Sequence, residues 1–238
     1  MEAKADSAQD PLSHRVGRVA APLRGQVLDL VRQGILDFHY KPGQRLIERE
    51  LIEEIGVSRT TVREVLRELE AEGLVKTIPQ KGAIVVVPTP EEAAELYEVR
   101  SALEQLTVRS FVERASDEQV AELRQASEAF GAASASGEGT QAMLRAKDAF
   151  YDVLLEGAGN KAVRTILGSL QARVRMLRAA SMSNPDRGRE IIDEIGALVS
   201  AIEARDADAA AISCASHLGT ARERGLTGIS SYSTPASA

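Results

Sequence analysis

Residues 51–75, LIEEIGVSRTTVREVLRELEAEGLV, contain two helix-forming runs separated by a short break. Gly56 can adopt the left-handed conformation that ends a helix, and Ser58 is a favoured N-cap residue for the helix that follows. That second helix opens on arginine and threonine side chains, while its other face is apolar. Two helices joined by such a tight turn predict a helix-turn-helix.

The flanking sequence extends this unit on both sides. In PLRGQVLDLVRQGILDF, residues 22–38, apolar side chains recur at near-helical spacing, and Pro42 and Gly43 follow as turn residues. After Gly73, the β-rich runs LVKTI and AIVVV flank the turn PQKG and predict a hairpin. The order helix, helix, turn, helix, hairpin predicts a winged helix-turn-helix over residues 21–88.

The second helix of the motif separates its basic and apolar side chains. At about 100° per residue, with Arg59 as zero, Arg63 falls near 40°, Arg67 near 80° and Thr60 near 100°. The apolar side chains cluster on the opposite side, from about 240° to 340°: Val62, Val65, Leu66 and Leu69. Helix N-termini attract phosphate, and arginine can pair with guanine edges. An isolated helix of this kind could also present a merely solvated charged face; the winged-helix context favours DNA.

The run PGQRLIERELIEEIGVSRTTVREVLRELEAEGLVKTIPQKGAIVV resembles the DNA-binding domain of the GntR family of bacterial transcription regulators. The match covers about 45 residues, including GVSRTTVRE, the segment EGLV and a wing. The resemblance implies a set of DNA-contacting residues: Arg49, Ser58, Arg59, Thr60, Thr61, Arg63, Lys81 and Gly82. Arg45 and Gln80 are weaker candidates.

The remainder of the chain contains no convincing strand, so the fold class is mainly α. VVPTPEE contains Pro88 and Pro90, and we expect a linker at residues 89–91. Six helical segments follow over residues 92–226, one of them capped by Ser116 with Gln119 at the capping-box position. Residues 1–20 and 227–238 are polar, and we expect a disordered arm and a disordered tail.

This second half resembles the all-α FCD effector-binding domain of the FadR-like subgroup. The segments LYEVRSALEQLTVRSF, AFYDVLLEGAGN and ALVSAIEARDADAAAISCASHL carry the resemblance in the expected order. Six helices place the chain with the VanR-like members. The resemblance implies a helical-bundle domain that binds an effector and forms a homodimer.

Many such domains bind a metal in a central cavity through one aspartate and three histidines. The corresponding positions here are Lys147, Tyr151, Ile195 and His217. One imidazole among an ammonium, a phenol and an isoleucine is not a Zn²⁺ or Ni²⁺ ligand set. We therefore expect no metal and no cofactor.

The same positions indicate what the cavity binds instead. The resemblance places Arg100 in the cavity, where it would bind a carboxylate, and Lys147 at a position that the family fills with a cation. A small carboxylate-type effector held by Arg100, Lys147, Tyr151 and His217 follows as a hypothesis. In the alternative, Arg100 pairs with Glu104 and Lys147 extends outward to solvent. Asn160 is expected to cap a helix, and nothing in the sequence decides where Arg175 points.

The charge distribution along the chain is compatible with a DNA-binding first domain. The net charge of −6 lies in the second half, because residues 1–88 carry 13 Lys and Arg against 13 Asp and Glu. A single cysteine and the absence of a long apolar run predict a cytoplasmic protein without membrane partners. We predict a repressor that binds a double-stranded palindromic operator and is not an enzyme. Two alternatives remain: a winged helix that binds protein, and a helical domain that catalyses a reaction.

Overall fold

The chain forms a winged helix followed by a helical bundle. The computed structural model describes residues 21–136, 139–182 and 187–233. The predicted arm, residues 1–20, and the last five residues of the predicted tail lie outside the described residues.

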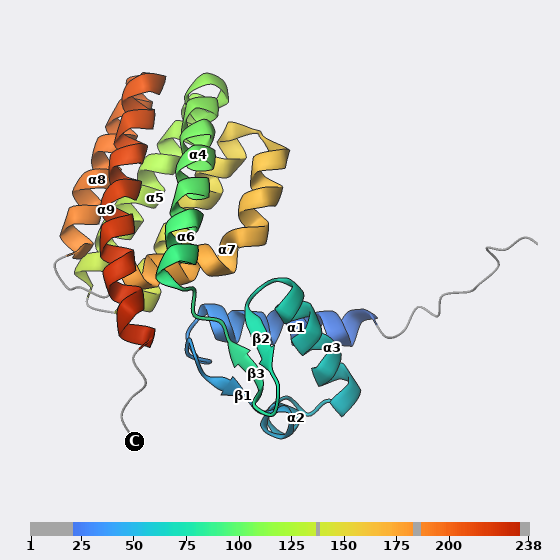
Figure 1. Ribbon diagram of the computed structural model, residues 1–238. Helices are drawn as coiled ribbons and strands as arrows, with labels where there is room; N and C mark the ends of the chain where they lie inside the picture. Colours follow the sequence, from blue (N-terminus) through green and yellow to red (C-terminus); the bar gives the residue numbers. More distant parts are fainter. Residues whose placement is uncertain (1–20, 137–138, 183–186, 234–238) are drawn as a thin grey trace, which may run out of the picture.

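The first domain has three helices and a small sheet, which lie below the helical bundle in the view of Figure 1. In chain order they are α1 (Ala21–Leu36), β1 (Arg45–Leu46), α2 (Glu48–Ile55), α3 (Arg59–Ala71), β2 (Val75–Ile78) and β3 (Gly82–Val85). The strands form an antiparallel sheet in the order β1-β3-β2. This confirms the winged helix-turn-helix. Strand β1 was not predicted, because two residues form a strand only by pairing with β3.

The local signals around α3 act as predicted. Gly56 ends α2 in the left-handed conformation, with φ of 74°. The Ser58 hydroxyl caps α3 by accepting a hydrogen bond from the Thr61 amide at 3.2 Å. The apolar face of α3 is buried in the core of the domain, so its basic face is directed outward.

The second domain is a bundle of six helices within the described residues, as predicted (Figure 1). They are α4 (Pro90–Arg114), α5 (Asp117–Ala135), α6 (Thr140–Ala158), α7 (Lys161–Ser181), α8 (Arg187–Glu203) and α9 (Ala207–Ser233). Helix α4 packs against α9, α6 and α7, and is therefore central to the bundle. Capping boxes at Thr89 and Ser116 fix the starts of α4 and α5.

Two predicted boundaries differ from the structure. The linker was placed at residues 89–91, but Thr89 already caps α4, and the connection therefore spans residues 86–89. The tail was expected from residue 227, but α9 continues to Ser233. Ile229 is fully buried against Tyr97 and Leu177, which explains why this polar-looking end is helical.

The two domains contact each other where α1 ends and α7 passes (Figure 1). Met176 of α7 packs into the core of the winged helix, and Phe38 packs against the core of the bundle. The junction is therefore built from side chains of both domains. Among the described residues, none of the helices combines the length and apolarity needed to cross a lipid bilayer.

Candidate nucleic-acid interface and buried polar cluster

A groove on the winged helix gathers arginines from three elements. Its volume is about 580 Å³, and its lining includes Arg45 of β1, Arg49 of α2 and Arg59, Arg63 and Arg67 of α3. Gly82, at the start of β3, lies at the same groove. Glu48 is its one acidic lining residue. Such a concentration of cationic side chains in one concavity suits the phosphates and base edges of nucleic acid.

The predicted DNA-contacting residues differ in whether their side chains already pair with an acidic neighbour. Arg63 donates from Nε to Glu48 at 2.9 Å yet is 57% exposed, and Arg49 lies 4.0 Å from Glu53. Surface pairs of this kind are weak enough to exchange for phosphate. Thr60 is exposed at the first turn of α3, where helix N–H groups are free.

The hydroxyls of Ser58 and Thr61 also serve the helix itself. They lie 2.9 Å apart, and Ser58 accepts from the Thr61 amide. Both therefore stabilise the start of α3. Lys81 and Gly82 are exposed at the wing, and Gly82 has φ of 78°, which favours glycine there.

Arg67 was projected onto the basic face but was left out of the predicted contacts. It lines the groove one turn after Arg63, and the i, i+4 spacing was the signal that could have included it. Arg45, a weaker candidate, lies at the wing: a Cβ at Gly82 would be 3.9 Å from its Nε.

A second polar site is buried inside the helical bundle. Arg100 and Glu104, one turn apart on α4, are 1% and 2% exposed and form an ion pair at 2.9 Å. Burial opposes the charge of Glu104, but Arg100 and Arg178 outweigh it and lower the pKa of the carboxyl. The structure therefore contains the alternative given above, in which Arg100 pairs with Glu104.

Arg178 of α7 joins this cluster from the other side. Its guanidinium lies 3.9 Å from the centre of the Tyr151 ring and donates from Nη1 to Asp148 at 2.8 Å. Burial, followed by the charge of Glu104, raises the pKa of Tyr151 well above its usual value, so the phenol is protonated. Arg178 and Asp148 were missed by the sequence analysis because the contact spans 30 residues.

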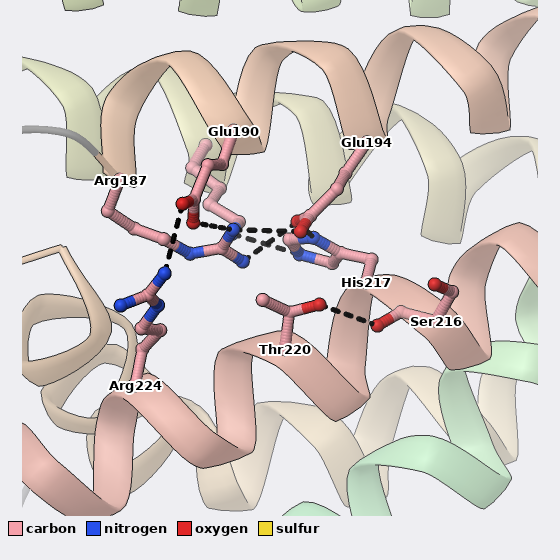
Figure 2. A network of polar contacts seen from close by, with 8 residues as sticks. Arg187, Glu190, Glu194, Ser216, His217, Thr220 and Arg224 are labelled. Atoms are coloured by element: carbon pink, nitrogen blue, oxygen red, sulfur yellow. Dashed lines mark hydrogen bonds and ion pairs between the residues drawn. The ribbon is translucent and has the colours of Figure 1, made fainter.

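Lys147 and His217 meet in an adjacent buried network. Lys147 Nζ is 3.1 Å from His217 Nε2, and His217 Nδ1 is 2.5 Å from Glu194 Oε2. Figure 2 shows His217 facing Glu194, which also pairs with Arg187 at 2.8 Å. Lys147 is 2% exposed, so the alternative in which it extends outward is wrong.

The protonation states in this network follow from burial and charge. Burial and then the nearby Lys147 lower the pKa of His217 to about 4. Burial opposes ionisation of Glu194, but hydrogen bonds from His217 and Arg187 outweigh it and lower its pKa to about 2. A neutral His217 can donate from Nδ1 to Glu194 and accept from Lys147 at Nε2. The imidazole therefore has both nitrogens occupied.

These residues do not fit the metal set that the resemblance implies. Lys147 Nζ lies where a metal bound to His217 Nε2 would have to be. Tyr151 faces Arg178, and Ile195 is part of the apolar core. In the described ranges, histidine, cysteine and acidic side chains form no group of three that could hold a metal. Glu194, which directly precedes Ile195, is the acid beside His217, and the sequence analysis did not identify it.

A pocket of about 200 Å³ opens beside the Arg100–Glu104 pair. Its lining comes from α4, α6 and α7: Glu104, Asp148, Tyr151, Asp152, Leu155, Arg164, Leu167, Gly168, Val174 and Arg178. Of the predicted effector residues, Tyr151 therefore lines the pocket, and Arg100 pairs with the lining residue Glu104 without lining the pocket itself. Lys147 and His217 belong to the neighbouring network.

Several buried polar atoms in this region have no hydrogen-bond partner among the described residues. They are Nη1 and Nη2 of Arg100, Oε2 of Glu104 and Nε of Arg178. An unsatisfied buried guanidinium nitrogen is costly unless something pairs with it. The cluster therefore presents donors to an acceptor group, and one acceptor to a donor group.

Comparison with known proteins identifies both domains. Residues 23–85 match the pattern of bacterial regulatory proteins of the gntR family, and residues 95–220 match the FCD domain. The Nta operon transcriptional regulator of Aminobacter aminovorans is 34% identical over 146 residues, which cover 60% of this chain and 67% of that protein. An uncharacterized HTH-type transcriptional regulator of Bacillus subtilis, YdhC, is 25% identical over 185 residues, covering 78% of this chain and 83% of that protein.

Solved structures share the fold. A putative GntR transcriptional regulator from a Rhodococcus species superposes with a TM-score of 0.77 at 22% identity, covering 86% of this chain and 98% of that one. McbR/YncC of Escherichia coli gives a TM-score of 0.70 at 24% identity, covering 83% and 93%. At these identities the likeness concerns the architecture.

The Lys147–His217 contact predicts that the bundle is independent of metal. Purified protein should contain no stoichiometric Zn²⁺ or Ni²⁺ by elemental analysis, and EDTA should leave its melting temperature unchanged, because Lys147 already occupies the free side of the imidazole. One tightly bound metal per chain, lost on His217→Ala, would contradict this assignment.

Proposed function

Because the chain belongs to the GntR family of bacterial regulatory proteins and carries an FCD domain, we propose that it is a cytoplasmic repressor that binds a palindromic operator as a homodimer and is controlled by a small organic anion. That it is a transcription regulator, and not an enzyme, follows from the family. The operator, the dimer, the sign of regulation and the effector are the parts we propose.

The observation that carries DNA binding is the groove of five arginines on one face of the winged helix. In the proposed complex, α3 enters the major groove with Arg59, Thr60 and Arg63 toward base edges and phosphates. Arg49 contacts the backbone, and Lys81 and Gly82 place the wing on the adjacent groove. Ser58 and Thr61 hold the N-terminus of α3 in position for phosphate. The same charge disfavours a winged helix that serves only to bind protein.

A dimer is proposed because one winged helix reads only a short half-site. Helix α4 supports this with Val99 and Leu106, which are 44% and 45% exposed and lie seven residues apart on one helical stripe. A two-fold contact between α4 helices would cover both side chains. It would also place two winged helices on one operator.

Repression is proposed from named relatives. The histidine utilization repressor of Pseudomonas aeruginosa is 32% identical over 104 residues, which cover 43% of this chain and 41% of that protein. A repressor that is released by a metabolite needs a ligand site outside the DNA-binding domain, and the bundle supplies a candidate.

The proposed effector is a small carboxylate that also carries a hydrogen-bond donor. The unpartnered Nη atoms of Arg100 and Nε of Arg178 suit a carboxylate, and the unpartnered Oε2 of Glu104 suits a hydroxyl, amide or ammonium group. Tyr151 provides an aromatic wall beside Arg178. Lys147 and His217 do not line this pocket; in the proposal they belong to the buried network next to it. A pocket of about 200 Å³ limits the effector to a small molecule.

DNA binding is tested by titration of an operator fragment selected from random sequence with the purified protein. Arg59→Ala and Arg63→Ala should each weaken specific binding by about 1–3 kcal/mol if the side chain contacts a base edge. Arg124→Ala, which removes an ion pair with Glu203 on the bundle, is the matched control and should bind normally. Unchanged affinity in both α3 variants would refute the assignment of the interface.

The effector site is tested with a panel of small hydroxy- and amino-carboxylates. The wild-type protein should lose operator affinity with at least one of them, by roughly 5- to 150-fold for an ordinary allosteric coupling. Arg100→Ala should no longer respond, because its guanidinium would pair with the carboxylate. The variant leaves Glu104 buried without its partner and should melt at a lower temperature, so operator binding and the response are measured below that temperature. If the variant responds at the same ligand concentration as wild type, Arg100 is not part of the effector site.

A further inference from the structure

Arg175 of α7 holds the end of α1, which belongs to the other domain. Its Nε donates to the backbone carbonyl of Leu36 at 2.9 Å, and its Nη2 pairs with Asp37 at 3.0 Å. The side chain is 7% exposed, so water competes little for these contacts. The last carbonyls of a helix lack partners within the helix, and a cation at that end is favourable. Arg175 is thus the C-terminal partner of α1.

The backbone around this contact is fixed from both sides. Gln141 of α6 donates to the carbonyl of Asp37 at 2.6 Å, and Phe38 packs against the bundle core. Phe38 has φ of 57°, a conformation that costs energy for a residue other than glycine. Met176, next to Arg175, is buried in the core of the winged helix. The junction therefore holds an unfavourable conformation in place by several tertiary contacts.

Asp148 of α6 connects this junction to the pocket. One carboxylate oxygen, Oδ2, accepts from Arg175, and the other, Oδ1, accepts from Arg178 at 2.8 Å. Asp148 is 14% exposed and lines the pocket together with Arg178. One carboxylate thus has two guanidinium partners, one at the pocket and one at the domain junction.

We propose that Asp148 is a positioning residue that couples pocket to winged helix, because Arg175 and Arg178 compete for its charge. An anion paired with Arg178 would withdraw that guanidinium from Asp148 and leave the carboxylate to Arg175. Arg175 would then be held more rigidly, and with it the end of α1. The proposal deepens the proposed function, since it assumes that the pocket is the effector site.

If Arg175 and Arg178 compete for Asp148, substitutions of these residues should change the stability of the end of α1 in opposite directions. Arg178→Gln imitates withdrawal of Arg178 from the carboxylate and should stabilise the end of α1. Asp148→Asn keeps the shape of the side chain but removes its charge, and Arg175→Gln removes the junction cation; both should destabilise the end of α1. A merely structural role of all three residues would give destabilisation in every case.

Hydrogen exchange of the full-length protein, without DNA or added anion, measures this directly. The amides of Asp37, Phe38 and Tyr40 are hydrogen-bonded to the carbonyls of Gln33, Ile35 and Gly34, so their exchange reports opening of this segment. Their exchange should be about fivefold faster in Asp148→Asn and Arg175→Gln, and about threefold slower in Arg178→Gln, for modest changes in local opening.

Two controls separate the junction from general instability. Arg124→Gln removes an ion pair of the same domain away from the junction and should leave these amides unchanged. Exchange within α5 reports whether each variant's bundle remains folded; a variant with faster exchange there is judged by the ratio of the two segments. Unchanged or faster relative exchange at the end of α1 in Arg178→Gln would overturn the coupling. Neither DNA nor effector is present in this experiment, so that result would not bear on DNA binding, which the operator titration tests separately.

Discussion

A buried guanidinium needs a carboxylate within hydrogen-bonding reach, and this requirement organises the effector domain. Arg100 pairs with Glu104, Arg178 with Asp148 and Arg187 with Glu194. Removing one member of such a pair typically costs about 3–5 kcal/mol, because the other charge stays buried without a partner. Arg178–Asp148 joins α7 to α6, whereas Arg100–Glu104 lies within α4 and Arg187–Glu194 within α8. The first pair therefore fixes two helices against each other, and the other two set the charges along their own helices.

The same requirement links the two domains. Arg175 donates a hydrogen bond to the last carbonyl of α1 and shares the Asp148 carboxylate with Arg178. The carboxylate of Asp148 therefore contacts both the pocket and the domain junction. The apolar contacts agree with this, since Phe38 and Met176 each pack into the core of the other domain. A regulator needs an element whose arrangement both sites can bias. The segment that follows α1 has this property. In the connection at residues 86–89, Val86 donates to the carbonyl of Leu74 in the winged helix and Val87 packs against the bundle.

Local signals in the sequence predicted most of the fold. Gly56, Ser58 and Ser116 act at their own helix ends, so their roles could be inferred from a few neighbouring residues. The helical projection of α3 likewise separated its buried and exposed faces. Strand β1 and the last turns of α9 could not be inferred in this way, because β1 depends on pairing with β3 and the end of α9 on burial of Ile229.

The sequence predicted more of the DNA-binding face than of the buried polar cluster. The DNA-contacting set comes from a resemblance over about 45 residues and stays a prediction; the structure places Arg67 at the same groove as Arg59 and Arg63. The buried cluster depends on contacts between distant segments: Arg175 reaches Leu36 across 139 positions, and Lys147 reaches His217 across 70. The sequence analysis gave Glu104 as an alternative partner of Arg100, but it did not identify Glu194 as the acid beside His217.

Scanning calorimetry of the full-length protein tests most directly whether the winged helix and the bundle form one unit through Arg175. If they do, the wild-type protein unfolds in a single transition, and Arg175→Gln separates it into two, with the smaller domain melting first. The isosteric Asp148→Asn should shift the profile in the same direction. Two separate transitions in the wild-type protein, or a single unchanged transition in Arg175→Gln, would contradict the account.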